Sequence, residues 1–256
     1  MKKITAFIGS QRKQATYGAV IEFEEALKTY EDVDFEIIFL KDYRLENCSG
    51  CKLCFTKGEE NCPLQDDRDL LIEKISNSDG VIIAAPNYSF HVPAAVKNLF
   101  DRLSFIFHRP RFFGKTFTSI VTQGMFGGDS IVKYLGGIGE NFGFKVSKGC
   151  VLNSLEPTTD DICRKNSKAI RKAAARYHRE LSRPAFPAPS LFRLMLFRMS
   201  RTNLKLILND GFCDYRHYRE KGWFKSDYYY DAPLGLLKKA MGLTFDFLGR
   251  QMAKNR

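Results

Sequence analysis

The segment Val81-Ile82-Ile83-Ala84-Ala85 is an uninterrupted apolar run that stops at Pro86, and the apolar spacing of residues 96–103 after it is helical. A continuous apolar run of this length is typical of a strand buried on both faces of a parallel sheet. The same strand-then-helix pattern recurs along the chain, with strands predicted at residues 4–8, 33–40, 117–122 and near 144–152. Five such units in succession predict an α/β fold built on a doubly wound, five-stranded parallel sheet.

Three loops of this predicted fold follow strands at the same edge of the sheet. They cover residues 9–16, 86–91 and 122–128. Ligands of open parallel sheets bind outside the carboxyl ends of the strands. We therefore expect the three loops to lie together around one binding site.

The strand-and-helix pattern ends at Arg183-Pro184-Ala185-Phe186-Pro187-Ala188-Pro189. The prolines in this stretch exclude a continuous helix and indicate a linker. We predict a first domain over residues 1–182 and a mostly helical extension over residues 183–256, with helices over 191–208 and near 233–251. Residues 184–256 hold 13 Lys and Arg against 6 Asp and Glu, so the extension is strongly basic.

The composition is that of a folded globular protein. Of the 256 residues, 44% are hydrophobic and 27% are charged, which excludes a disordered or collagen-like chain. The net charge of +11 indicates an anionic partner: a phosphate ligand, nucleic acid, an acidic protein or a membrane surface. Because +7 of this charge lies in residues 184–256, it says little about a phosphate bound by the first domain. The N-terminal apolar run is too short for a signal peptide, and no stretch approaches the length of a membrane-spanning helix. We expect a cytoplasmic protein.

The loop after the first strand, Gly9-Ser10-Gln11-Arg12-Lys13-Gln14-Ala15-Thr16, has the chemistry of a site for a single terminal phosphate. Glycine permits the tight turn, the hydroxyls of Ser10 and Thr16 can donate hydrogen bonds, and Arg12 adds a cation. The exposed N–H groups of the helix that follows favour an anion. The loop lacks the patterns of dinucleotide and nucleoside-triphosphate loops.

The second loop and its helix read Ala85-Pro86-Asn87-Tyr88-Ser89-Phe90-His91-Val92-Pro93-Ala94-Ala95-Val96-Lys97-Asn98-Leu99-Phe100-Asp101-Arg102. This segment resembles the flavin-contacting segment of the NAD(P)H-dependent FMN reductases of the flavodoxin-like superfamily. The first loop resembles the phosphate loop of that family, although Gln14 and Ala15 stand where its members often have Ser and Asn. The resemblance spans residues 1–182 and implies a flavodoxin-like sheet of strand order 2-1-3-4-5.

The same resemblance implies FMN as the cofactor, NAD(P)H as the co-substrate, and a set of residues that bind FMN. Residues expected at the phosphate are Gly9, Ser10, Arg12 and Thr16. Residues expected at the ring are Pro86, Asn87, Tyr88, Ser89 and Phe90, with Thr122, Gln123 and Gly124 on its other side. No catalytic side chain is expected, because the redox chemistry belongs to the cofactor.

Four of the seven cysteines lie close together, with the spacing Cys-x2-Cys-x2-Cys-x7-Cys. They are Cys48, Cys51, Cys54 and Cys62. Compact spacing of this kind suits a [4Fe–4S] cluster, with a tetrahedral zinc site or four thiols without metal as alternatives. The run resembles that of the iron–sulfur flavoproteins, a branch of the same superfamily, which carry a [4Fe–4S] cluster beside FMN.

These features together predict an FMN-dependent NAD(P)H oxidoreductase, similar to flavin and quinone reductases, that uses a [4Fe–4S] cluster for electron transfer. Two alternatives stay open: a one-electron carrier fed by ferredoxin without NAD(P)H turnover, and a zinc-stabilised binding module. The expected partners are NAD(P)H and a small electron acceptor or ferredoxin.

The basic extension has three interpretations. It is an amphipathic cover or dimerisation element over the flavin site, a solvated basic face packed on the core, or a helix attached to an anionic membrane. We favour the first, which implies a homodimer, and rank membrane contact last. No helix-turn-helix, finger or RNA-binding signature accompanies the charge, so no nucleic-acid partner is expected.

Overall fold

The protein is described here by a computed structural model that covers residues 1–255. Met1–Ser49 and Leu64–Arg183 form one compact unit, and a parallel sheet lies at its centre. The strands are β1 (Lys2–Ile8), β2 (Val33–Phe39), β3 (Gly80–Pro86), β4 (Thr116–Gln123), β5 (Lys145–Val146) and β6 (Cys150–Asn153). Their order is β2-β1-β3-β4-β5, and β6 also pairs with β4. The predicted flavodoxin-like order 2-1-3-4-5 is confirmed.

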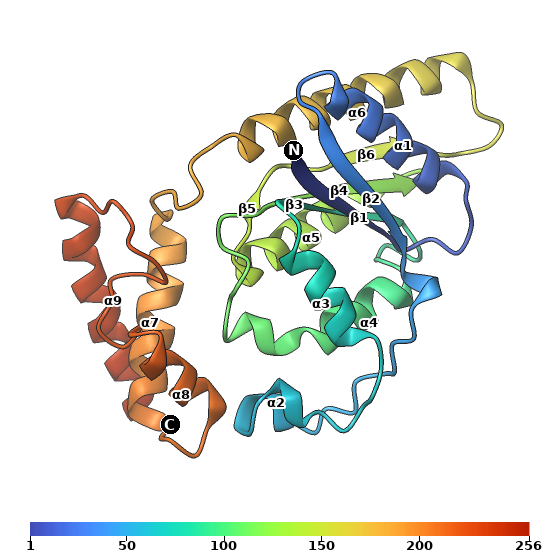
Figure 1. Ribbon diagram of the computed structural model, residues 1–256. Helices are drawn as coiled ribbons and strands as arrows, with labels where there is room; N and C mark the ends of the chain where they lie inside the picture. The colour runs from blue at the N-terminus through green and yellow to red at the C-terminus, as the bar shows by residue number, and fades with distance from the viewer. Residues whose placement is uncertain (256) are drawn as a thin grey trace. The chain divides into compact units, whose positions relative to one another are not determined.

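Helices cover both faces of this sheet (Figure 1). On one face lie α1 (Ala15–Lys28) and α6 (Asp160–Leu181), which pack against each other. On the other lie α3 (Arg68–Ser76), α4 (Ala94–Arg102) and α5 (Gly128–Phe142). Because helices cover both faces, the residues of β3 and β4 are almost all buried. The continuous apolar run of β3 predicts this burial, whereas β4 is buried although it contains Thr118 and Ser119.

The parallel register brings the ends of the central strands to one edge. Ile8 of β1 is aligned with Ala84 of β3, and Pro86 at the end of β3 is aligned with Thr122 of β4. The Gly9 N–H donates to the Ala84 carbonyl at 2.8 Å, which continues the ladder into the first loop. The loops after β1, β3 and β4 therefore begin side by side.

The strand predicted near 144–152 is interrupted. Phe117 of β4 is aligned with Val146, and Ile120 is aligned with Cys150. Three residues, 147–149, therefore lie opposite the two residues 118–119, so the last strand contains a bulge. A Cβ atom at Gly149 would lie 2.3 Å from the Ser119 carbonyl oxygen, so the bulge approaches β4 at a distance that only glycine allows.

A buried ion pair fixes the segment that precedes α3. The sequence predicts Asp66 or Asp67 as the cap of this helix, and an ion pair between the neighbours Asp101 and Arg102. The Asp66 carboxylate accepts a hydrogen bond from the N–H of Arg68, the first residue of α3, at 3.2 Å. The partner of Arg102 is Asp66, at 2.7 Å, and not Asp101; both side chains of this pair are buried. The Asp66 carboxylate also accepts a hydrogen bond from the Glu46 N–H at 2.9 Å. Asp66 therefore fastens α4 to the chain that leads from β2 toward the cysteines.

Gly50–Pro63 and the chain from Pro184 onward form a second compact unit. Its helices are α2 (Leu53–Thr56), α7 (Leu191–Ile207), α8 (Cys213–Glu220) and α9 (Leu236–Lys254). Helices α7 and α9 lie side by side (Figure 1). Contacts between α2 and α8, with a hydrogen bond of 3.1 Å from Arg216 to the Lys57 carbonyl, join the cysteine-containing loop to this unit.

Buried ion pairs fix the pairing of α7 and α9. Arg198 of α7 contacts Asp246 of α9 at 2.7 Å, and Arg201 binds the other oxygen of the same carboxylate. Gly249 lets the helices approach closely, because a Cβ atom there would lie 2.9 Å from the Met199 carbonyl oxygen. Among residues 1–255, no helix combines the length and the apolar character needed to cross a membrane.

Candidate functional site

A cavity of about 540 Å³ lies in the sheet unit at the carboxyl ends of the strands. Its walls come from the loops after β1, β3, β4 and β6. The lining residues are Ser10, Arg12, Gln14, Ala15, Thr16, Pro86, Asn87, Tyr88, Thr122, Gln123, Gly124, Ser154, Leu155 and Glu156. The volume falls in the range typical of sites for small molecules and cofactors.

The amino end of α1 opens onto this cavity. Gln14 precedes the helix, and its side chain does not cap the first turn. The first turn also contains no acidic residue. Unsatisfied N–H groups and the helix dipole favour an anion at such a position. Ser10, whose hydroxyl donates to the Arg12 carbonyl at 3.0 Å, holds the preceding loop in a tight turn.

The loop after β3 is a tight turn with a strained tip. Tyr88 and His91 exchange backbone hydrogen bonds of 2.9 and 3.0 Å, and Ser89 and Phe90 between them have φ values of +50° and +65°. This left-handed conformation is uncommon outside glycine. The turn projects Tyr88 and Phe90 outward, and both rings are exposed. The His91 ring instead packs against Tyr134, with 4.7 Å between the ring centroids.

Asn87 links this turn to the loop after β4. Its amide nitrogen donates to the Phe126 carbonyl at 2.9 Å, while its Oδ1 atom is buried and has no hydrogen-bond partner among the described residues. The ring of Phe90 packs on Phe126 at 5.3 Å. Gly127, with φ of +97°, lies against Phe90 and Asn87, since a Cβ atom there would lie 2.8 Å from the Phe90 ring and 3.2 Å from the Asn87 amide nitrogen. The two loops thus support each other.

The structure brings nine of the twelve predicted cofactor residues to the cavity wall: Ser10, Arg12, Thr16, Pro86, Asn87, Tyr88, Thr122, Gln123 and Gly124. Gly9, Ser89 and Phe90 are not in the wall. Gly9 instead packs against the sheet, where a Cβ atom would lie 2.3 Å from Val96. Ser89 and Phe90 form the tip of the turn beside the cavity.

The part of the cavity wall that follows β6 was not predicted from the sequence. Ser154, Leu155 and Glu156 reach the cavity because the Ser154 N–H donates to the Gln123 carbonyl at 2.7 Å. The available signal was their position directly after the last predicted strand, at the same edge of the sheet. Gln14 and Ala15, noted only as departures from the family pattern, also line the wall.

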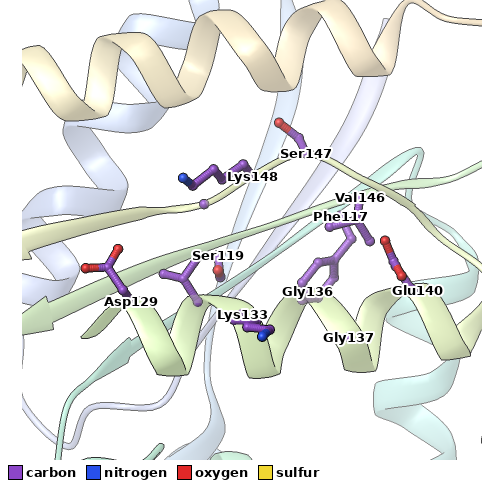
Figure 2. Close-up of a pocket in the computed structure, with 12 residues that line it drawn as sticks. Phe117, Ser119, Asp129, Lys133, Gly136, Gly137, Glu140, Val146, Ser147 and Lys148 are labelled. Carbon is purple, nitrogen blue, oxygen red and sulfur yellow. The ribbon is translucent and has the colours of Figure 1, made fainter. Parts of the chain in front are cut away.

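A second cavity, of about 530 Å³, lies between α5 and residues 146–149. Figure 2 shows Asp129, Lys133 and Glu140 on α5, with Lys148 on the facing segment. Two acids and two lysines balance in charge, so this wall does not favour a phosphate group. The cavity lies beside the middle of β4, and none of the predicted cofactor residues lines it.

The four clustered cysteines differ in exposure. Cys48 and Cys51 are exposed, and Cys54 and Cys62 are half-buried. Within residues 1–255, no group of three or more His, Cys, Asp or Glu side chains is arranged to hold a metal ion. The four thiols suit a [4Fe–4S] cluster in number and spacing.

The sheet order and the cavity at the strand ends define this protein as a member of the flavodoxin-like class. Residues 2–155 match the family described as NADPH-dependent FMN reductase, and the chain belongs to this family.

Several relatives have similar sequences. An "Iron-sulfur flavoprotein" of Archaeoglobus fulgidus is 36% identical over 121 residues, which cover 46% of this chain and 53% of that protein. Another, of Methanosarcina thermophila, is 35% identical over 102 residues, or 39% of this chain and 51% of that protein. An "NAD(P)H-dependent FAD/FMN reductase" of Geobacillus thermodenitrificans is 31% identical over 80 residues, or 31% of this chain and 39% of the relative. The chain thus spans about half the length of the iron–sulfur flavoproteins it matches.

Solved structures share the fold at low sequence identity. The azoreductase of Bacillus anthracis superimposes with a TM-score of 0.55 at 15% identity, covering 70% of this chain and all of that one (100%). The NAD(P)H:quinone oxidoreductase of Methanothermobacter marburgensis gives a TM-score of 0.51 at 18% identity, covering 68% of this chain and 97% of that one. These similarities concern the fold alone.

Proposed function

We propose that the cavity at the strand ends binds FMN and that the protein is an FMN-dependent NAD(P)H oxidoreductase. The observation that carries the proposal is the convergence of three predicted loops on one cavity of about 540 Å³ at the uncapped end of α1. The phosphate would lie at this helix end, among Ser10, Arg12 and Thr16. Membership of the FMN reductase family supports the same cofactor.

The ring would lie against the turn after β3. Asn87 lies in the wall of the cavity, and its amide nitrogen binds the Phe126 carbonyl at 2.9 Å. It would therefore hold the turn after β3 and the loop after β4 together around the ring. The loop after β4, with Gly124 in the wall, allows a flat ligand to approach the backbone.

When bound, FMN supplies the two-electron chemistry that takes a hydride from NAD(P)H and passes electrons to an acceptor. The protein's own residues hold the ring and form the surface that the acceptor meets. Five exposed apolar side chains belong to the loops around the cavity: Tyr88, Phe90, Met125, Phe126 and Leu155. We propose a planar, apolar acceptor such as a quinone, because such a surface favours it over a charged one.

A comparison of FMN with riboflavin tests the phosphate position. We expect Arg12→Gln to weaken FMN binding about ten-fold, because a hydrogen-bonded charge contact is lost, and to leave riboflavin binding unchanged. Lys13→Gln is the matched control, since it removes the same charge from the next residue, which is absent from the cavity wall. Equal losses in both variants, or a native chain that binds no flavin, would contradict the proposal.

Turnover is tested separately on the FMN-loaded protein. We expect oxidation of NADH or NADPH that accelerates when a quinone is added. A flavin-loaded protein that NAD(P)H cannot reduce, but that reduced ferredoxin can, would favour the carrier described next.

The second candidate is an iron–sulfur electron carrier. It is favoured by the Cys-x2-Cys-x2-Cys-x7-Cys spacing and by the names of the archaeal relatives. Anaerobic purification followed by iron and acid-labile sulfide analysis tests it. Iron and sulfide in equal amounts, lost in Cys51→Ser but not in Cys163→Ser, would support a cluster; zinc alone would support a structural metal instead.

A further inference from the structure

One face of helix α9 is buried against the other helices of its own unit. Gly242, Phe245, Asp246 and Gly249 are buried there. The Asp246 carboxylate binds Arg198 and Arg201 of α7, and a Cβ atom at Gly242 would lie 3.1 Å from the Arg198 guanidinium. Buried ion pairs and close glycine contacts cannot be kept if the helix rotates. The packing therefore determines which face of α9 is turned outward.

The outward face of α9 is apolar. Leu236, Leu243 and Phe247 are 88%, 67% and 52% exposed. At 100° per residue these three side chains fall within an arc of about 40°, which lies on average about 130° around the helix from the buried glycines. Further exposed apolar side chains continue the face: Leu237, Leu248 and Met252. Single exposed apolar residues are common on protein surfaces. A row of them along one helix instead indicates a surface that binds a protein or a membrane.

The charges beside this stripe are all positive. Lys239, Arg250 and Lys254 are exposed, and none of them forms an ion pair with any residue from 1 to 255. The one acidic residue of α9 is Asp246, which is buried against α7. The outward face therefore presents apolar side chains and cations, with no anion of its own to balance them.

This charge pattern distinguishes between the possible binding partners of the outward face of α9. A second copy of the chain would bring one set of cations against another, and like charges at an interface oppose association. An anionic phospholipid surface complements both features, since its acyl region accepts the apolar side chains and its headgroups attract Lys and Arg. We propose that α9 docks flat on anionic phospholipid membranes. Leu243 and Phe247 would enter the acyl boundary, and Lys239 and Arg250 would meet the phosphates.

Vesicle sedimentation with the full chain tests this proposal and does not depend on flavin or activity. The probes are vesicles of phosphatidylcholine alone and of equal parts phosphatidylcholine and phosphatidylglycerol. We expect binding to the mixed vesicles, weak binding to the neutral ones, and a steep loss of binding as salt is added. A native chain that sediments with neither kind of vesicle would overturn the proposal.

Two pairs of variants separate the apolar and the electrostatic contributions. Leu243→Glu with Phe247→Glu should abolish binding, and Lys239→Gln with Arg250→Gln should weaken it about 30-fold at low salt. The matched controls lie in the sheet unit, on exposed positions: Leu70→Glu for the apolar pair, and Lys168→Gln with Arg171→Gln on α6 for the charges. Both controls should bind as the native chain does.

Circular dichroism and thermal melting check that each variant is folded. If folded Leu243→Glu/Phe247→Glu still binds mixed vesicles as the native chain does, the proposal is wrong. A native dimer that this variant converts to a monomer, without vesicle binding by either, would identify a second copy of the chain as the occupant and would equally overturn it.

Discussion

The hydroxyl oxygens of Thr16 and Thr122 lie 2.8 Å apart and share a buried hydrogen bond. Thr16 is in the first turn of α1, and Thr122 is next to the end of β4. The bond therefore joins the helix end proposed for the phosphate to the loop proposed for the flavin ring. Both side chains line the same cavity.

We expect Thr122→Val to weaken FMN binding about ten-fold and to lower the free energy of unfolding by about 1 kcal/mol, because the buried Thr16 hydroxyl loses its partner. Isothermal titration and urea unfolding measure the two effects. Thr118→Val is the matched control: Thr118 lies on the same strand, and its hydroxyl is buried without a partner in the described chain. That control should retain FMN affinity and native stability; a loss as large as that of Thr122→Val would refute the role of the bond.

Gly9→Ala should lower the free energy of unfolding by about 2 kcal/mol, because overpacking forces neighbouring groups apart. The added Cβ atom would lie 2.3 Å from Val96, directly under the phosphate loop. We also expect weaker FMN retention in gel filtration. Gly18→Ala, which meets no atom within 4 Å in the interior of α1, should instead stabilise the protein by about 1 kcal/mol. Similar stability in the two variants would contradict the packing described for Gly9.

The Asp66–Arg102 pair predicts a pH-dependent stability. Burial by itself would raise the pKa of Asp66, but hydrogen bonds from Arg102 and from the backbone amides of Glu46 and Arg68 outweigh burial and lower the pKa. Because the pKa is lower in the folded state, the pair stabilises the protein above the ordinary carboxyl pKa of about 4, and the effect is lost as the pH falls further.

Asp66→Asn should therefore lower the free energy of unfolding by about 3 kcal/mol near neutral pH. Urea unfolding across a pH series measures the difference between the variant and the native chain. That difference should shrink as the pH falls below about 4. Asp101→Asn, in the exposed ion pair with Lys97, is the control that should show little effect. A difference that stayed constant with pH would argue against the ion pair as its cause.

The cysteines should differ in reactivity toward iodoacetamide. Burial raises the pKa of Cys150 to about 12, whereas Cys48, Cys51 and Cys163 are exposed. Since the thiolate is the reacting form, Cys150 in the native protein should react at least on the order of a thousand-fold more slowly near pH 8. Mass spectrometry of timed digests measures the four rates. Denaturation in urea should equalise them, and rapid labelling of Cys150 before denaturation would contradict its burial.

Much of the fold follows from local sequence alone. The run Val81–Ala85 is apolar without interruption, and a strand needs such a run only when both faces of its sheet are covered. The position of each loop after its strand then places it at the carboxyl edge, whatever the details of packing. For this reason nine of the predicted cofactor residues lie in one cavity wall.

Contacts between distant residues depended on the tertiary structure. Thr16 and Thr122 are 106 positions apart, and no periodicity in either segment indicates their pairing. Arg102 has Asp101 beside it in the sequence but binds Asp66, because Asp101 faces Lys97 on the exposed side of α4. Ser154 joins the cavity only because a bulge sets the position of β6 against β4.

In the basic extension, too, some properties follow from the sequence and others only from the tertiary structure. The sequence by itself determined that residues 184–256 are helical, cationic and rich in apolar side chains, since these are properties of composition and spacing. Only the tertiary structure decided which apolar residues of α9 are buried and which are exposed. Both faces of that helix are largely apolar, and the outward face is set by Asp246, whose carboxylate must stay buried against Arg198 and Arg201.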